Sequence, residues 1–277
     1  MFTAVVASAL ALLVAAPAHA QSWAGWHIGG SVGSVIPKRN ASETITFDTN
    51  LDRIFTDEVR TASGANAFSP GFCGGLAVNA TAAAGCMDDD AGIDAGGRLG
   101  YDWQVGRFVF GGLVDVSRTE VVDSVTAFST TPAFYSFTRE AETLAGLRGR
   151  VGIGSNRVLA YATFGGAWAN IDEQFTTSNS VNTFVRAGDI DDDDEGTKSV
   201  WGYQAGGGIE IRLGGHWSLG GEYVFTSLDD RNESTIRAQG PAPATNPFIL
   251  VNASGTDFRR SGSLELQAVR AMLSYRF

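Results

Sequence analysis

The chain holds few of the residue types that carry out catalysis. Histidine, the commonest general base, occurs three times, as His19, His27 and His216. None of the three stands near a phosphate-binding loop or a second metal-binding residue at a characteristic spacing. We therefore expect no catalytic residue, no metal site and no cofactor, and the sequence disfavours an enzyme that depends on histidine.

Two acidic runs and two cysteines are the remaining candidates for chemistry. The run Asp189–Glu195 has the carboxylates that Ca²⁺ prefers, but it lacks the glycine and the distal glutamate of an EF-hand loop. A solvated acidic loop is the favoured interpretation there and at Asp88–Asp90. Cys73 and Cys86 lack the CxxC spacing of redox and zinc sites. In an exported protein we expect them to form a disulfide, the alternative being two free thiols.

Composition and the first residues indicate a folded, exported protein. The chain has 277 residues, of which 44% are hydrophobic, and its net charge is −10. It contains no basic cluster, which argues against a nucleic-acid partner. Residues 1–20 carry an apolar run over Val5–Ala16 and end in Ala18-His19-Ala20, which is typical of a signal peptide, although no Lys or Arg precedes the run. We predict a signal peptide over 1–20 and one domain over 21–277.

The elements that must position all these residues are strands. Eight segments carry apolar or aromatic side chains at every second position, which is the period of a β-strand. They are Trp26–Val35, Ile93–Trp103, Phe108–Ser117, Glu142–Ile153, Val158–Ala169, Val200–Arg212, Trp217–Phe225 and Leu264–Phe277.

The connections between these segments favour a membrane barrel over a soluble sandwich. Short turns at 104–107, 154–157 and 213–216 alternate with long polar connections at 36–92, 118–141, 170–198 and 226–263. Transmembrane barrels show this asymmetry because their periplasmic turns are short and their outer loops long. Aromatic residues also gather near both ends of the segments, as in interfacial girdles. We predict an all-β fold, an eight-stranded antiparallel up-and-down transmembrane barrel with four long extracellular loops.

The polar face of the segments carries acids and arginines in equal number. Period alone does not tell a soluble barrel, with this face outside, from the inverted membrane form, but the signal peptide, girdles and loops favour the latter. The barrel interior is then only wide enough for side chains, so opposed charges would form a structural network rather than an acid–base site. The predicted interior charges are Asp94, Arg98, Asp102, Asp115, Glu142, Arg148, Arg150, Glu210, Arg212, Glu222, Arg270 and Arg276.

Three stretches resemble the small OmpA-like outer-membrane barrels, in particular the porin-family or opacity-type surface antigens of Gram-negative bacteria. They are the opening Trp23–Gly30, the glycine-rich Trp201–Glu210 and the C-terminal Arg270–Phe277. The last resembles the signal that the barrel-insertion machinery recognises, with Tyr275 and Phe277 as its aromatic residues and Met272 where glycine is usual. The resemblance implies a location in the bacterial outer membrane.

The sequence favours a surface protein with a structural, adhesive or envelope-integrity role. Its expected partners are outer-membrane lipid, lipopolysaccharide, the insertion machinery and host or environmental ligands at the loops. A small-solute porin is the alternative, and its obstacle is the charged interior of a narrow barrel. A haem-binding surface protein and an outer-membrane lipid-modifying enzyme are less favoured, because no histidine lies in a predicted long extracellular loop: His27 and His216 both fall at the periplasmic end.

Overall fold

The computed structural model describes residues 22–38, 44–89, 91–187, 197–229 and 235–277. The predicted signal peptide and the acidic run Asp189–Glu195 lie outside the described residues. Within these ranges no helix is long and apolar enough to cross a membrane.

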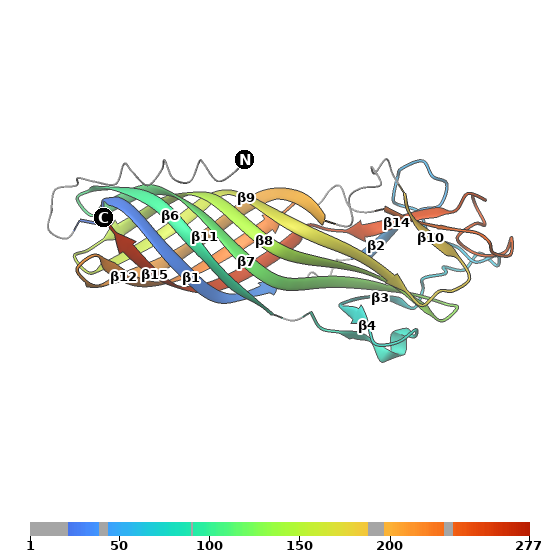
Figure 1. Cartoon of the computed structure of the whole chain (residues 1–277). Helices are drawn as coiled ribbons and strands as arrows, with labels where there is room; N and C mark the ends of the chain where they lie inside the picture. The colour runs from blue at the N-terminus through green and yellow to red at the C-terminus, as the bar shows by residue number, and fades with distance from the viewer. Residues whose placement is uncertain (1–21, 39–43, 90, 188–196, 230–234) are drawn as a thin grey trace, which may run out of the picture.

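Eight antiparallel strands close into a barrel (Figure 1). Around the barrel their order is β1, β6, β7, β8, β9, β11, β12 and β15, and β15 pairs back to β1. The strands are β1 (Gly25–Pro37), β6 (Gly92–Val105), β7 (Phe108–Ser129), β8 (Ala133–Gly154), β9 (Val158–Thr177), β11 (Thr197–Gly214), β12 (Trp217–Leu228) and β15 (Leu264–Arg276). The predicted fold is confirmed, and each predicted strand corresponds to one of these eight.

The period-two pattern separates an outer and an inner face. On β15, Val269 and Leu273 are exposed, whereas the neighbouring Arg270 and Ser274 are buried. The exposed face is apolar, which in a closed sheet without free edges suits contact with lipid. The three short turns lie at the barrel end where β15 finishes (Figure 1).

The predicted limits of β7 and β8 at Ser117 and Glu142 are wrong. Both strands have 22 residues and continue far beyond the barrel, so that only 130–132 separates them. Their outer halves lose the alternation of buried and exposed residues, and Asp123–Phe128 is buried without interruption. Because other segments cover both faces of the sheet there, the sequence shows no period of two.

Short strands from the long connections build a folded head on these extensions (Figure 1). A four-stranded sheet has the order β10 (Thr183–Ala187), β13 (Thr235–Gln239), β14 (Thr256–Ser261) and β2 (Thr44–Asp48). Separately from this sheet, β3 (Gly71–Gly74) pairs with the outer part of β7. Next to it lies a small lobe with β4 (Leu76–Ala77), a 3₁₀ turn (Ala82–Ala84) and β5 (Cys86–Met87).

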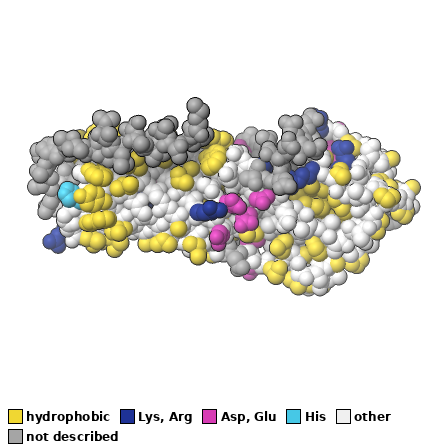
Figure 2. All heavy atoms as spheres, viewed as in Figure 1, with side chains coloured by type: hydrophobic (Ala, Val, Ile, Leu, Met, Phe, Trp, Pro, Cys, Tyr) yellow, Lys and Arg dark blue, Asp and Glu magenta, His cyan; other side chains and the backbone are white. Residues whose placement is uncertain are grey.

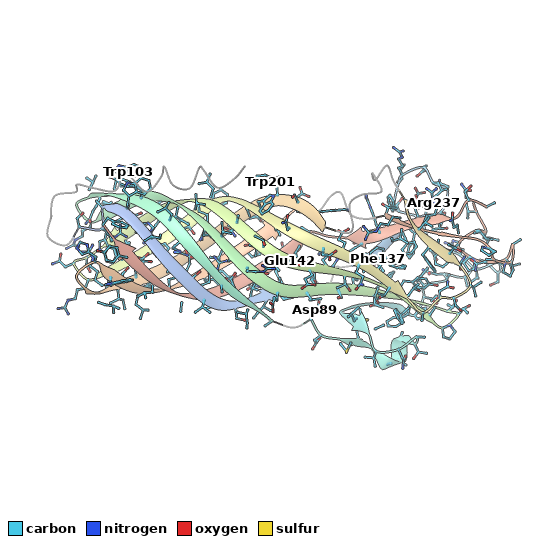
Figure 3. The ribbon with its side chains drawn as sticks, in the orientation of Figure 1. Asp89, Trp103, Phe137, Glu142, Trp201 and Arg237 are labelled. Atoms are coloured by element: carbon cyan, nitrogen blue, oxygen red, sulfur yellow. A yellow bond between two sulfur atoms is a disulfide. The ribbon has the colours of Figure 1, made fainter. Side chains whose placement is uncertain are left out.

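The head has its own hydrophobic core, rich in phenylalanine. Phe258 of β14 is fully buried and packs against Phe47, Phe137 and Tyr135 at ring-centroid distances of 5.7–6.2 Å. Phe137 of β8 and Arg237 of β13 mark this part of the molecule in Figure 3. Aromatic burial of this extent stabilises a compact unit rather than a set of loose loops.

A second apolar cluster fills the barrel near the head. It joins inward side chains of several barrel strands, among them Leu144, Ile171, Leu228 and Leu266, all at most 2% exposed. The barrel interior is therefore apolar near the head and charged nearer the short turns. The sequence predicts only a polar inner face and misses this apolar layer.

Candidate functional site

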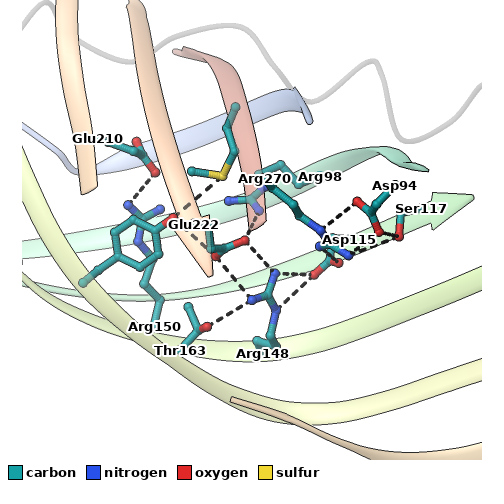
Figure 4. Close-up of polar contacts among 12 residues, drawn as sticks. Asp94, Arg98, Asp115, Ser117, Arg148, Arg150, Thr163, Glu210, Glu222 and Arg270 are labelled. Atoms are coloured by element: carbon teal, nitrogen blue, oxygen red, sulfur yellow. Dashed lines mark hydrogen bonds and ion pairs between the residues drawn. The ribbon is translucent and has the colours of Figure 1, made fainter. Parts of the chain in front are cut away.

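The middle of the barrel holds a balanced cluster of three acids and three arginines (Figure 4). Arg98 donates to Glu222 at 2.5 Å, and Arg148 donates to Asp115 at 2.7 Å and to Glu222 at 3.3 Å. Arg270 pairs with Asp94 at 2.8 Å and with Asp115 at 3.2 Å. All six side chains are at most 5% exposed on their own side-chain atoms. The opposed charges thus compensate one another in a site removed from solvent.

A second balanced cluster lies closer to the short turns. Arg150 donates to Glu210 at 2.7 Å, and Arg276 pairs with Asp102 at 3.1 Å. Tyr161 lies between the two clusters, with the Arg150 guanidinium 3.9 Å from its ring centre and its own hydroxyl donating to Glu222 at 3.3 Å. The two clusters together contain five acids and five arginines, which are Asp94, Asp102, Asp115, Glu210, Glu222, Arg98, Arg148, Arg150, Arg270 and Arg276.

Two of the predicted interior charges lie elsewhere. Glu142 is exposed, because a β-bulge between Ala141 and Thr143 shifts the register of β8 and turns its side chain outward. Arg212 is half-buried at the end of β11, where it donates to the Ser22 carbonyl at 2.5 Å rather than to a carboxylate. The placement of Glu142 inside the barrel is therefore wrong, and Arg212 belongs to the barrel mouth.

Small residues on the inner face leave the space that the ion clusters occupy. A side-chain carbon added at Gly111 would collide with the Asp102 carboxylate, and one at Gly146 would collide with the Gln204 amide. A larger residue at 111 would therefore displace Asp102 of the interior clusters, and one at 146 would displace Gln204 and crowd Asp115. The inner glycines are part of the packing and not merely points of backbone freedom.

Trp23 closes the barrel end that carries the short turns. Its side chain is fully buried, its indole donates to the Ser155 carbonyl at 2.7 Å, and its backbone N–H donates to Gln104 at 2.6 Å. The guanidiniums of Arg212 and Arg276 lie 4.3 Å and 5.4 Å from the ring centre, within cation–π range. The sequence shows Trp23 only as part of the opening motif and does not predict its burial. The alternation of buried and exposed residues that reveals inward side chains begins with the first strand, after Trp23.

The described histidines form no catalytic arrangement with a nucleophile. His27 is 1% exposed with its Nε2 3.5 Å from Asp102, and His216 stacks on Tyr275 at 5.3 Å and hydrogen-bonds the Arg276 carbonyl. Among the described ranges, no group of three or more His, Cys, Asp and Glu residues has the arrangement of a metal site.

The outer surface marks the membrane boundaries. Trp103 and Trp201 lie towards opposite ends of the barrel, while Glu142 and Asp89 lie between the barrel and the head (Figure 3). Figure 2 shows hydrophobic side chains over the barrel and acidic ones gathered midway along the molecule. The exposed residues of β7 change there from Val114 and Val116 to Arg118 and Glu120. The uncharged outer surface of the barrel, on the side of the short turns, can contact lipid tails. The exposed charges where the barrel meets the head suit the headgroup region.

Cys73 and Cys86 form a disulfide that joins β3 to β5. The cross-link closes the small lobe beside the outer part of β7, and the expected pairing of the two cysteines is confirmed.

Two polar groups stabilise the head. The Arg237 guanidinium donates to both oxygens of Asp257 at 2.6 Å and 2.8 Å, and this hydrogen bonding raises the pKa of Arg237. Burial raises the pKa of the Tyr135 hydroxyl, which accepts a hydrogen bond from Asn179 at 2.9 Å. The hydroxyl therefore stays protonated at physiological pH, as a neutral polar group in an aromatic core.

Comparison with known proteins identifies the family. The family model described as "outer membrane protein beta-barrel domain" matches residues 5–277. The chain belongs to this family. As an outer-membrane barrel it resides in the bacterial outer membrane, which agrees with the predicted localisation.

The relatives of this outer-membrane barrel include surface antigens. It is 27% identical over 151 residues to the 31 kDa outer-membrane immunogenic proteins of Brucella melitensis and Brucella suis, a match that covers 53% of this chain. The aligned region spans 59% of the length of those relatives.

Solved structures similar to this outer-membrane barrel are remote. The attachment invasion locus protein Ail of Yersinia pestis, solved with a heparin analogue, aligns with a TM-score of 0.35 and 10% identity, covering 91% of this chain and 99% of that one. A Pseudomonas aeruginosa FadL homologue aligns with a TM-score of 0.27 and 9% identity, covering 91% and 90%.

Proposed function

We propose that this protein is a closed outer-membrane anchor that holds a folded head at the cell surface, where it has a structural or adhesive role. The observation that carries the proposal is the filled barrel. A charge-balanced interior of five acids and five arginines lies between Trp23 at one end and an apolar cluster at the other. This filling supports an anchor because an eight-stranded barrel has little interior space beyond its side chains.

The junction between barrel and head supports a rigid display of the head. Asp123 of β7 accepts from Arg139 of β8 at 2.8 Å and from Arg260 of β14 at 2.5 Å. All three side chains are at most 5% exposed. These bonds join the head sheet to the strands that continue from the barrel, so the head would keep a fixed orientation on its anchor. A fixed orientation suits a surface that contacts lipopolysaccharide, neighbouring proteins or host molecules.

The proposed role is not enzymatic. His27 and His216 lie at the barrel end opposite the head, and the head sequence has no histidine to ligate haem or to act as a base. The names of the Brucella relatives, as immunogenic outer-membrane proteins, support exposure of such a head to the surroundings.

Single-channel recording in planar bilayers tests the closed anchor against the porin alternative. The wild-type protein should insert, as judged by heat-modifiable gel migration of the reconstituted sample, and give no discrete openings. Reproducible openings that disappear when Arg148 or Glu210 is replaced would favour the porin and overturn the proposal. The gel assay separates a closed barrel from a failure to insert.

A further inference from the structure

A shallow groove of about 670 Å³ lies in the outer wall of the barrel, across the neighbouring strands β6, β1, β15 and β12. The outward residues at its centre are Gly30 of β1 and Ala271 of β15, so its floor is largely backbone. Gly30 lies opposite Gly97 of β6, a second outward glycine. Figure 2 shows a white area without hydrophobic side chains in this half of the barrel wall. The groove is therefore a hollow where large outward side chains are missing from an apolar wall.

Large apolar side chains surround this hollow. Ile28 and Val32 are the outward residues on either side of Gly30 along β1, and Leu219 and Leu273 stand on β12 and β15. All four side chains are exposed, by 45–58%. None of the described residues that line the groove carries a charge. The groove thus encloses an apolar ligand between projecting side chains and has no group that would bind an ionic one.

Two aromatic residues form the end of the groove nearest the short turns. Trp217 and Tyr275 lie opposite each other on β12 and β15, with ring centres 5.1 Å apart. Tyr275 also stacks on His216 of the β11–β12 turn, at 5.3 Å. Aromatic rings at the ends of barrel strands lie at the level of the lipid headgroups. The groove therefore begins at one membrane interface and runs into the hydrocarbon region.

The position of the groove indicates which partner fits it. The short turns of an outer-membrane barrel face the periplasm, so the interface at Trp217 belongs to the inner leaflet, which consists of glycerophospholipids. The groove is continuous with the uncharged barrel surface that contacts lipid tails. Its volume lies within the range of about 300–1,000 Å³ that encloses a small ligand, which suits a single acyl chain.

We propose that this groove holds one acyl chain of an inner-leaflet glycerophospholipid in a fixed position. The chain lies over Gly30 and Ala271, and its glycerol end reaches Trp217 and Tyr275. Filling the hollow restores the dispersion contacts that an unfilled space beside the wall would lose. The inference depends on the location in the outer membrane and not on a closed interior, so its failure would leave the proposed anchor standing.

Native mass spectrometry tests the proposal on the full-length protein extracted from outer membranes in a mild detergent. We expect one retained glycerophospholipid for each barrel. Gly30→Leu fills the hollow and should weaken retention about tenfold, the change expected when contact with about two methylene groups is lost. A side chain fits at this position, because its Cβ would lie 3.8 Å from the nearest heavy atom, the Gly96 carbonyl oxygen.

Gly166→Leu is the matched control. Gly166 is an outward glycine of β9, on the opposite side of the ring of strands, and its Cβ would meet nothing within 4 Å. This variant should retain the lipid as the wild type does. Ala271→Leu and Ala162→Leu repeat the comparison on β15 and β9, and heat-modifiable gel migration shows that each variant is folded. Equal retention in Gly30→Leu and Gly166→Leu would refute the location.

Cross-linking in vesicles of phosphatidylethanolamine and phosphatidylglycerol makes the test independent of detergent. The probe is a phosphatidylethanolamine with a diazirine in its acyl chain, added as a minor component. Label on peptides of β1 and β15 should exceed label on β9 at least threefold and fall to the β9 level in Gly30→Leu. Equal label on these strands in the wild type would overturn the proposal, whatever the detergent sample retains. Retention of lipopolysaccharide or of a second copy of the chain, lost in Gly30→Leu, would also overturn it.

Discussion

Replacement of Glu222 by glutamine should unbalance the interior cluster and destabilise the barrel. Glu222 accepts from Arg98 at 2.5 Å, from Arg148 at 3.3 Å and from Tyr161 at 3.3 Å. Arg148 would keep Asp115 and Thr163, but Arg98 would lose its one ion-pair partner in the described structure. Removing one partner of a buried pair costs about 3–5 kcal/mol, and we expect a loss of that size.

A double-mutant cycle shows whether the charge is the cause. Arg98→Met keeps an apolar stem of similar length, so the double variant Arg98→Met/Glu222→Gln restores a neutral interior. It should be more stable than Glu222→Gln alone, with a coupling free energy of about 2–3 kcal/mol. The assay is equilibrium unfolding from lipid vesicles in urea, followed by tryptophan fluorescence.

A matched control is Glu140→Gln, the same change at an exposed position of β8. It should shift the free energy of unfolding by less than about 0.5 kcal/mol, as surface substitutions usually do. The reasoning would be refuted if Glu222→Gln cost less than about 1 kcal/mol, or if the two single effects simply added in the double variant.

Four further variants test other parts of the structure. Trp23→Ala should lower the stability of the barrel by about 3–5 kcal/mol in the same urea assay. It should not produce ion conductance, because the two ion clusters still fill the interior, and a conducting variant would contradict that role of the clusters. Phe258→Ala should loosen the head by about 3–5 kcal/mol, seen as new proteinase K cleavage while gel migration of the barrel stays heat-modifiable, and an uncut head would argue against a shared core. Replacing Cys73 and Cys86 by serine should lower the stability of the small lobe by up to about 3 kcal/mol, measured as protease cleavage within 71–87, and leave the barrel unchanged. A lower free energy of unfolding of the barrel would show instead that the lobe and the barrel are coupled. Deleting Phe277 should lower the amount of assembled barrel without lowering synthesis, compared by immunoblot of membrane and total fractions, and equal membrane levels would count against its role in insertion.

The barrel could be predicted from the sequence because the membrane imposes one environment on each face. From Phe108 to Ser117 each outward residue meets lipid and each inward residue meets the interior, so the alternation is strict. Beyond that point β7 is covered on both sides, and the pattern that reports a strand disappears over Asp123–Phe128. The sequence therefore predicts polar loops where the structure has a folded head with a phenylalanine-rich core.

The interior cluster was predictable by residue type but not in every position. Ten of the predicted charges point inward because alternation fixes their side, whereas Glu142 lies in a bulge that no local sequence signal indicates. The burial of Trp23 depends on segments far apart in the chain. Its indole, for example, reaches the Ser155 carbonyl only through tertiary packing.

Photolabelling with a carbene precursor confined to lipid tails tests most directly which face of the barrel meets the membrane. The folded protein in vesicles is irradiated, digested and analysed by mass spectrometry. We predict label on Val114, Leu147 and Leu273, which are exposed on the barrel surface, and none on the buried neighbours Asp115, Arg148 and Ser274. Label on the second set with protection of the first would contradict the arrangement from which the anchor, its closed interior and its displayed head all follow.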